Sequence, residues 1–146
     1  MKTRSFTARS GHNLAFTSMG FGTAPLGNLY APLTDETARA TLDAAWSAGC
    51  RYFDTAPFYG LGLSETRLNP FLRAHRTTPP LLSSKIGRLL KPCAPAERSA
   101  QDHYIDTPAR LVVFDYSYDG VMRSVEDSLA RLGVDQIDIL LCHDID

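Results

Sequence analysis

Apolar residues recur along the chain at two spacings, one typical of helices and the other typical of strands. Between Thr34 and Gly49 the recurrence is that of an amphipathic helix, and these two residues suit its N-cap and its C-terminal stop. The apolar positions of this stripe are Ala38, Leu42, Ala45 and Trp46. A later stripe predicts another helix, which Ser117 or Asp119 caps and Gly133 ends. Its apolar positions are Val121, Val125, Leu129 and Leu132.

Short runs of β-favouring residues lie between the helical segments and predict strands. They span 18–22, 52–53, 81–86 and 137–142. Residues 4–16 predict an N-terminal hairpin, because a Ser-Gly-His-Asn turn separates two short segments there. Residues 64–75 are also helical in pattern, but a proline inside a helix costs roughly 3 kcal/mol. If Asn69 is a cap and Pro70 begins a new helix, the element is kinked or divided in two.

Residues 87–118 form a long excursion between the third predicted strand and the following helix. They lack clear periodicity as far as Leu111, and they contain Pro92, Pro95 and Pro108. Long stretches of this kind are usually functional or disordered. Their aromatic side chains could line a substrate pocket or could pack to fix the loop, and the sequence favours neither interpretation. These residues are Tyr104, Phe114, Tyr116 and Tyr118.

The elements alternate between strand and helix, which predicts parallel strands joined by right-handed crossovers. A doubly wound sheet and a (β/α)8 barrel both satisfy this order. The barrel explains more, because Asp54, Lys85 and His143 all fall at C-terminal ends of predicted strands, where the active site of such barrels lies. Tyr59 lies in a loop on the same rim. We therefore expect an α/β fold of the TIM-barrel family that brings these four side chains together.

The composition is typical of one soluble globular domain, and it bears on whether nucleic acids or membranes are partners. The 146 residues are 44% hydrophobic with a formal net charge of -1, which gives no indication of nucleic acid or an anionic membrane as a partner. No apolar run approaches the roughly 20 residues of a membrane helix, and the polar N-terminus has no signal-peptide core. We expect a cytoplasmic protein. The three cysteines have no Cys-x-x-Cys spacing, which predicts reduced thiols and no metal site.

The four rim residues form a chemically coherent set. A lysine ammonium within reach of a tyrosine favours the tyrosinate and so makes proton transfer near neutral pH more efficient. Asp54 would pair with Lys85, and His143 could position a substrate oxygen or join the proton path. The set suits a carbonyl that is protonated as a hydride arrives, or the reverse reaction. The Gly20-Phe21-Gly22 segment lacks the third glycine of a Rossmann fingerprint.

The chain resembles the N-terminal half of an aldo-keto reductase. The motifs that carry the resemblance are Phe53 to Gly60, Ser84-Lys85, Asp138 to His143 and Gly22-Thr23-Ala24. The resemblance covers nearly all 146 residues and implies a (β/α)8 barrel, of which 1–146 would be a single partial domain with about four strands and three helices. It also implies a hairpin beneath the barrel.

The resemblance further implies the chemistry of the site. Its catalytic tetrad would be Asp54, Tyr59, Lys85 and His143, and the expected cofactor is NAD or NADP in extended form. The residues expected beside the nicotinamide are Gly22, Thr23, Ala24 and Asp54. No metal takes part.

Within the family, residues 114–120 with Arg123-Ser124, and the ending 143–146, resemble the aldose dehydrogenase branch, with its L-fucose or D-threo-aldose 1-dehydrogenases and pyridoxal 4-dehydrogenases. This similarity implies oxidation of a cyclic hemiacetal to a lactone, with NAD favoured as the cofactor. The expected ligand is a small carbonyl or sugar substrate. At Asn69-Pro70 the chain departs from relatives that more often carry a glycine and an uninterrupted helix.

The length of the chain leaves the activity of residues 1–146 open, because a (β/α)8 barrel needs about 250 residues. One hypothesis is a dehydrogenase whose barrel is completed by the missing C-terminal half or by a second copy. The alternatives are a catalytically inactive half-barrel fragment and a non-catalytic NAD(P)-binding subunit.

Overall fold

The computed structural model of the protein describes residues 1–99 and 103–145. Its strands and helices follow one another as β1 (Thr3–Thr7), β2 (Asn13–Thr17), β3 (Phe21–Gly22), α1 (Asp35–Ser47), β4 (Tyr52–Asp54), α2 (Leu63–Ala74), β5 (Leu81–Ile86), β6 (Arg88–Pro92), β7 (Arg110–Phe114), α3 (Tyr118–Leu132) and β8 (Ile139–Cys142). Short 3-10 helices lie at η1 (Ala24–Gly27) and η2 (Pro95–Glu97). None of the helices in the described part of the chain is long and apolar enough to cross a bilayer.

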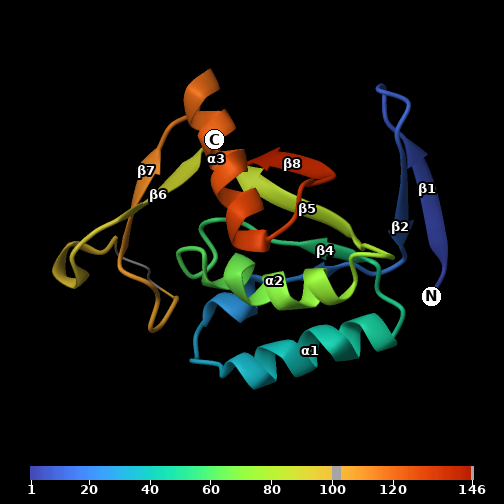
Figure 1. Cartoon of the computed structure of the whole chain (residues 1–146), viewed down its shortest axis with the longest axis horizontal. Helices are drawn as coiled ribbons and strands as arrows, with labels where there is room; N and C mark the ends of the chain where they lie inside the picture. Colours follow the sequence, from blue (N-terminus) through green and yellow to red (C-terminus); the bar gives the residue numbers. More distant parts are fainter. Residues whose placement is uncertain (100–102, 146) are drawn as a thin grey trace.

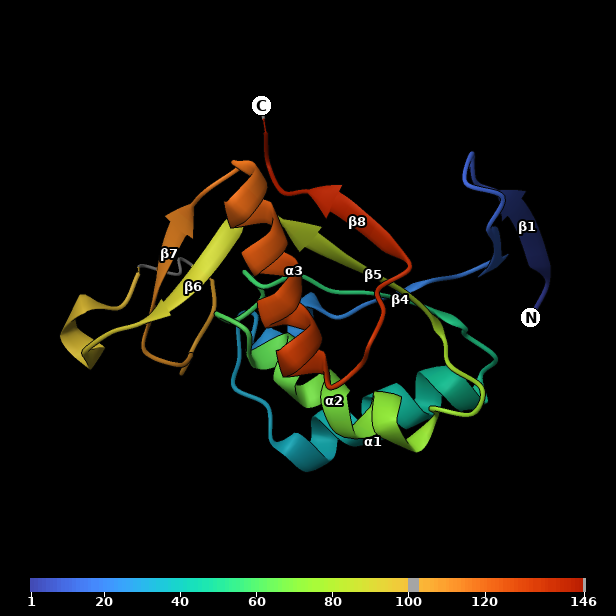
Figure 2. The same cartoon turned by 45° about the horizontal axis from the view of Figure 1, so that its top comes forward.

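A parallel sheet with the order β3-β4-β5-β8 organises the molecule. In its register Gly22 pairs with Asp54, Asp54 with Ser83, and Ser83 with Ile139. Helices α1 and α2 lie against one side of this sheet, and α3 crosses beside β5 (Figure 1). The β1–β2 hairpin lies near the ends where the parallel strands begin, and the β6–β7 hairpin lies near the ends where they finish (Figure 2).

The hydrophobic core fills the space between the sheet and the helices. Phe53 of β4 is fully buried, and its ring lies 5.1 Å from that of Phe71 on α2. Leu42 of α1, Leu82 of β5 and Leu132 of α3 close the same cluster. Each such side chain contributes roughly 1.5–3 kcal/mol on burial, so the core holds the strand ends in a fixed relation.

The helix ends follow the capping residues that the sequence predicted. The Thr34 hydroxyl accepts a hydrogen bond from the Thr37 amide at 3.2 Å, and Ser117, rather than Asp119, accepts from the Gly120 amide at 3.1 Å. Gly133 ends α3 in the left-handed conformation. The residues of α3 that become buried are Leu132 and the small Gly120, Ser124 and Ser128, while the valines of the predicted stripe are only half-buried. Small residues on this face let the α3 backbone approach its neighbours closely.

The prediction that Pro70 divides a helix in two is wrong. Helix α2 runs without interruption from Leu63 to Ala74 with Pro70 inside it. The proline removes the hydrogen bond to the carbonyl of Thr66, and both residues are exposed. Water can therefore hydrate that carbonyl, which explains why the helix continues.

Residues 87–118 are more ordered than the sequence indicated, because β6 and β7 pair antiparallel as a hairpin with Arg88 opposite Phe114. The residues between the two strands include Ala100, Gln101 and Asp102, which lie outside the described residues. Two predicted strands are shorter than expected: β3 begins at Phe21 and β8 at Ile139. The pairing of β6 with β7 joins residues far apart in the sequence, so local periodicity does not reveal it.

Strands β3 and β8 form the edges of the parallel sheet within the described residues. On β8, Leu140 is 42% exposed and Leu141 is 44% exposed. Strands of parallel sheets are normally buried on both faces. The sheet therefore presents an unusually apolar edge at β8.

Candidate active site

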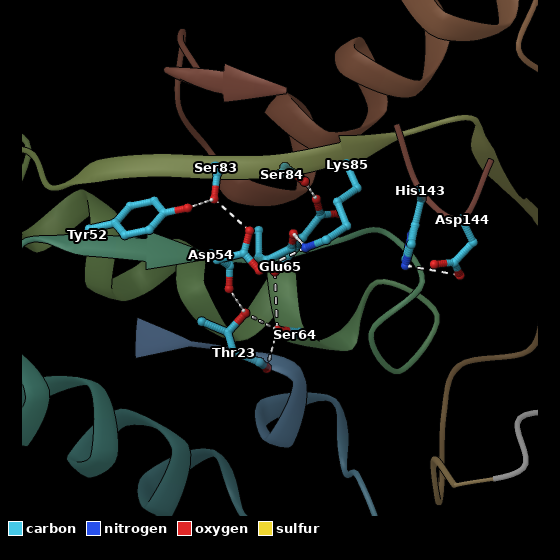
Figure 3. Close-up of polar contacts among 11 residues, drawn as sticks. Thr23, Tyr52, Asp54, Ser64, Glu65, Ser83, Ser84, Lys85, His143 and Asp144 are labelled. Atoms are coloured by element: carbon cyan, nitrogen blue, oxygen red, sulfur yellow. Dashed lines mark hydrogen bonds and ion pairs between the residues drawn. The ribbon is translucent and has the colours of Figure 1, made fainter. Parts of the chain in front are cut away.

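The C-terminal ends of β4, β5 and β8 bring the predicted rim residues together. Asp54 is the last residue of β4, Lys85 lies near the end of β5, and His143 follows β8 directly. The Lys85 ammonium donates to Asp54 Oδ2 at 2.8 Å and to the carbonyl of Thr55 at 3.0 Å (Figure 3). The expected pairing of Asp54 with Lys85 is therefore present.

Tyr59 lies beside this ion pair, in the loop between β4 and α2. The Lys85 ammonium is 4.8 Å from the centroid of the Tyr59 ring, and the His143 ring centroid is 6.1 Å from it. The loop is held by a close approach of Gly60 to Gly27, where a Cβ on Gly60 would overlap the Gly27 backbone. Glycine at this position thus lets the loop pack against η1 and place Tyr59 over the strand ends.

Ser83 fixes the carboxylate of Asp54, and the sequence prediction missed it. Its hydroxyl donates to Asp54 Oδ1 at 2.6 Å and is 3.0 Å from the Tyr52 hydroxyl. Strand alternation puts Ser83 on the same face as Lys85, two residues away, and the register pairs it with Asp54. This alternation is the sequence signal that could have identified Ser83. Both carboxylate oxygens of Asp54 are thus hydrogen-bonded, one to Ser83 and one to Lys85.

The Lys85 side chain remains protonated in this environment. Burial of the ammonium lowers the pKa of Lys85, but hydrogen bonding and charge from Asp54 and Tyr59 outweigh this effect and raise the pKa above its ordinary value of 10.5. The ammonium is therefore a permanent positive charge beneath Tyr59 at neutral pH.

His143 is buried and uncharged at neutral pH. Its side chain is 10% exposed, and burial followed by the charge of Arg88 lowers the pKa of His143 to about 4. Its Nε2 atom lies 3.7 Å from Asp144 Oδ2, and its backbone carbonyl accepts a hydrogen bond from the Tyr116 hydroxyl. The Nδ1 atom is buried without a hydrogen-bond partner among residues 1–99 and 103–145. A neutral imidazole can orient a substrate oxygen, but it is a poor acid at pH 7.

The segment expected beside the nicotinamide lies next to Asp54, at the end of β3. The Thr23 amide and hydroxyl both donate to the Asp54 carbonyl at 2.9 Å, and the Ser64 hydroxyl donates to the Thr23 carbonyl at 2.8 Å. Thr23 is fully buried, so its side chain holds β3 against β4. Gly22 pairs with Asp54, and a Cβ at Gly22 would meet open space. The residues present therefore fit a flat ring over Gly22, whereas half-buried Ala24 begins η1.

The aromatic residues of the excursion divide between the two interpretations that the sequence left open. Tyr104 stacks on Tyr59 with ring centroids 6.4 Å apart, and it borders the site. Burial and the neighbouring tyrosines raise the pKa of Tyr104, so its phenol stays protonated. Tyr116 is 41% exposed, and its hydroxyl donates to the backbone carbonyl of His143. Phe114 and Tyr118 are 63% and 79% exposed.

A hollow of about 780 Å³ lies away from these residues, at the opposite ends of the strands. It is bordered by Trp46, Arg51, Pro80 and Asp138 among others. None of the four rim residues borders this hollow. Chemistry, and not cavity size, identifies the candidate active site.

Comparison with known proteins identifies the family of the chain. Residues 18–146 match the sequence model of the Aldo/keto reductase family. The chain belongs to this family. The family expected from the sequence motifs is confirmed. The segment 143–146, which carried the resemblance to the aldose dehydrogenase branch, includes Asp146, which lies outside the described residues.

Two curated aldo-keto reductase relatives are dehydrogenases. The pyridoxal 4-dehydrogenase of Microbacterium luteolum is 45% identical over 140 residues, which cover 90% of this chain and 41% of the relative. The D-threo-aldose 1-dehydrogenase of a Pseudomonas species is 43% identical over 142 residues, which cover 94% of this chain and 43% of the relative.

A solved aldo-keto reductase shows the same fold. The enzyme from Bacillus halodurans, in its holo form, superposes with a TM-score of 0.71 and 27% identity over 98% of this chain and 40% of its own. The parallel strands and crossover helices are therefore part of a (β/α)8 barrel, as predicted. The chain spans less than half the length of these relatives.

Proposed function

We propose that residues 1–146 supply the catalytic rim of an NAD(P)-dependent oxidoreductase that transfers a hydride between nicotinamide and a carbonyl or hemiacetal carbon. The observation that carries this proposal is the position of Lys85. Its ammonium is fixed by Asp54 at 2.8 Å and lies 4.8 Å from the ring of Tyr59. This arrangement suits a proton transfer by tyrosine that accompanies hydride transfer.

Each rim residue has a distinct proposed role. Tyr59 exchanges the proton with the substrate oxygen, and Lys85 stabilises the tyrosinate that forms. Asp54 holds the ammonium in place with one carboxylate oxygen while Ser83 orients the other. His143 is neutral, so of its two predicted roles we favour positioning of the substrate oxygen over a place in the proton path.

The cofactor would lie over the end of β3. A Cβ at Gly22, which pairs with Asp54, would meet open space, and Thr23 and Ala24 follow in the chain. The nicotinamide supplies or accepts the hydride when it is bound. NAD is the favoured form, because the resemblance to the aldose dehydrogenase branch favours it.

The substrate class follows from the two dehydrogenase relatives. One is named for pyridoxal and the other for D-threo-aldoses, and both compounds form cyclic hemiacetals. Oxidation of a cyclic hemiacetal removes a hydride from carbon and a proton from its hydroxyl group, and it leaves a lactone. In this proposal Tyr59 and neutral His143 receive that hydroxyl group.

Turnover also requires the remaining strands of the barrel. The apolar β8 edge, with Leu140 and Leu141 more than 40% exposed, supports a partner surface at that strand. We propose that a C-terminal half, or a second copy of these residues, pairs with β8 and covers this edge. The rim would then be enclosed and shielded from water.

The test is a steady-state assay of pyridoxal and L-fucose oxidation, each with NAD and with NADP. In the protein with a completed barrel we expect lactone formation, a severe loss of turnover in Tyr59→Phe, and no loss in the control Tyr118→Phe, because Tyr118 is exposed. Full turnover in Tyr59→Phe would contradict the proton-transfer role. Cofactor binding without turnover would instead identify a non-catalytic NAD(P)-binding subunit, and neither binding nor turnover would identify an inactive half-barrel.

A further inference from the structure

Arg88 reaches from the β6–β7 hairpin to the residues that follow β8. Its guanidinium lies 4.2 Å from the centroid of the Phe58 ring and 5.1 Å from that of Phe114, and it forms an ion pair with Asp144. Only 9% of its side chain is exposed, whereas Asp144 is 64% exposed. The guanidinium is therefore held between two aromatic rings next to the residue that follows His143.

The turn before Arg88 makes this arrangement possible. Gly87 has a φ of +96°, and a Cβ there would overlap the ring of Tyr116. Tyr116 in turn donates its hydroxyl hydrogen to the carbonyl of His143, and the His143 amide donates to the Ile86 carbonyl at 3.2 Å. The ends of β5 and β8 and the start of β6 are thus joined around one glycine.

We propose that Arg88 is a positioning residue for His143: through Asp144 and the Phe58 ring it fixes the imidazole at the rim and couples it to the β6–β7 hairpin. The Phe58 ring also contacts the imidazole, with centroids 5.8 Å apart. This inference rests on the proposed function only in giving His143 a role in the reaction. The contacts themselves are independent of it.

In an arginine with a purely structural role, we expect every buried N–H group to have a hydrogen-bond partner. The Nε atom of Arg88 and the Nδ1 atom of His143 are both buried without hydrogen-bond partners in the described part of the chain. Unsatisfied buried polar atoms are rare in proteins and indicate a functional group or an unseen partner. These two atoms belong to residues that share the contacts with Phe58 and Asp144.

Because charged groups surround His143, the coupling can be measured as a change in the pKa of its imidazole. Burial and the cations of Arg88 and Lys85 lower the pKa of His143, whereas the carboxylates of Asp144 and Asp54 raise it. Tyr59 and Tyr116 also contact this residue, through the ring of Tyr59 and the hydroxyl of Tyr116. Removal of the Arg88 charge should therefore raise the pKa of the imidazole.

The experiment is NMR titration of the His143 imidazole nitrogens in the purified protein, with the signal assigned from His143→Gln. In the parent protein we expect a neutral ring from pH 8 down to about pH 5. In Arg88→Met the midpoint should rise by about one pH unit or more, and Arg88→Lys should restore most of the low value. Arg73→Met, at an exposed arginine of α2, is the matched control and should leave the titration unchanged.

An unchanged midpoint in a folded Arg88→Met protein would overturn the proposal, because loss of a merely structural contact would lower stability alone. Asp144→Asn tests the same coupling from the exposed end if Arg88→Met fails to fold. In Asp144→Asn the amide signal of Leu89 and the ring signals of His143 should both shift, and an unchanged signal at either residue would refute the coupling. Neither measurement depends on turnover, so failure of the proposed reaction would be seen separately.

Discussion

The buried ion pair between Glu65 on α2 and Arg131 on α3 offers a quantitative test of how the helices are joined to the sheet. The Arg131 Nε donates to Glu65 Oε2 at 2.6 Å, and the Ser84 hydroxyl of β5 donates to Oε1 at 2.9 Å. The Glu65 side chain is 0% exposed and that of Arg131 is 14% exposed. The substitution Glu65→Leu removes both acceptors and leaves the guanidinium without a counter-ion.

The expected cost is large because the remaining charge is buried. Removal of one partner of a buried ion pair costs about 3–5 kcal/mol. A second cation adds to this cost, since Arg110 interacts with both Arg131 and Glu65, and burial with the charge of Arg131 lowers the pKa of Arg110. For a chain of this size, about 3–5 kcal/mol corresponds to a fall of roughly 6–20 °C in Tm.

Urea unfolding followed by the fluorescence of Trp46, the single tryptophan, measures the change. The control is Asp43→Ala, which breaks the exposed ion pair with Arg39 on α1 and should cost no more than about 0.5 kcal/mol. The double substitution Glu65→Leu and Arg131→Met should recover most of the loss, because it removes the unpaired charge. A loss below about 1 kcal/mol in Glu65→Leu would refute the reasoning, since the carboxylate would then not be satisfying a buried charge.

The remaining predictions concern two backbone positions, Gly87 and Pro70, and the protonation of His143. Gly87→Ala should lower the free energy of unfolding by at least about 2 kcal/mol in urea titration, because φ is positive and the Tyr116 ring fills the space; an unchanged midpoint would contradict the close contact. Pro70→Ala should raise stability by about 1–2 kcal/mol by restoring an α2 hydrogen bond, as measured by thermal unfolding; a loss would show that the proline is favourable there. Since the folded-state pKa of His143 is about 4, below the ordinary 6.5, the unfolded chain binds a proton first as the pH falls. Protonation of His143 should therefore lower the free energy of unfolding by about 3 kcal/mol between pH 7.5 and pH 4. In His143→Gln this part of the pH dependence of the urea midpoint should be absent.

The sequence was sufficient wherever a local pattern determines the structure. Thr34 and Ser117 cap helices because their hydroxyls reach amides three residues later, and such signals are contained in a few adjacent residues. Asp54, Lys85 and His143 were found because strand ends meet on one rim in parallel sheets. The contact of Asp54 with Lys85 followed from that rule alone.

The sequence was insufficient where pairing between distant residues decides the outcome. The antiparallel pairing of Arg88 with Phe114 joins positions on either side of a long loop, so no periodicity near Arg88 indicates a strand or a link to His143. Helix α2 continues past Pro70 because that part of the helix is exposed to solvent. The helix propensity of proline carries no information about exposure. Ser83 differs from these, because strand alternation from Lys85 would have placed it beside Asp54.

The two sides of the candidate active site are held in different ways. Asp54 and Lys85 lie on β4 and β5, which have a paired strand on each side, and their side chains are fixed by short hydrogen bonds within the sheet. His143 follows β8, which pairs only with β5 in the described residues, so contacts outside the sheet must fix its ring. Those contacts come from the β6–β7 hairpin through Arg88 and Tyr116. Because the hairpin lies outside the parallel sheet, a change that displaces it would alter the position of the imidazole while the ion pair of Asp54 with Lys85 persists.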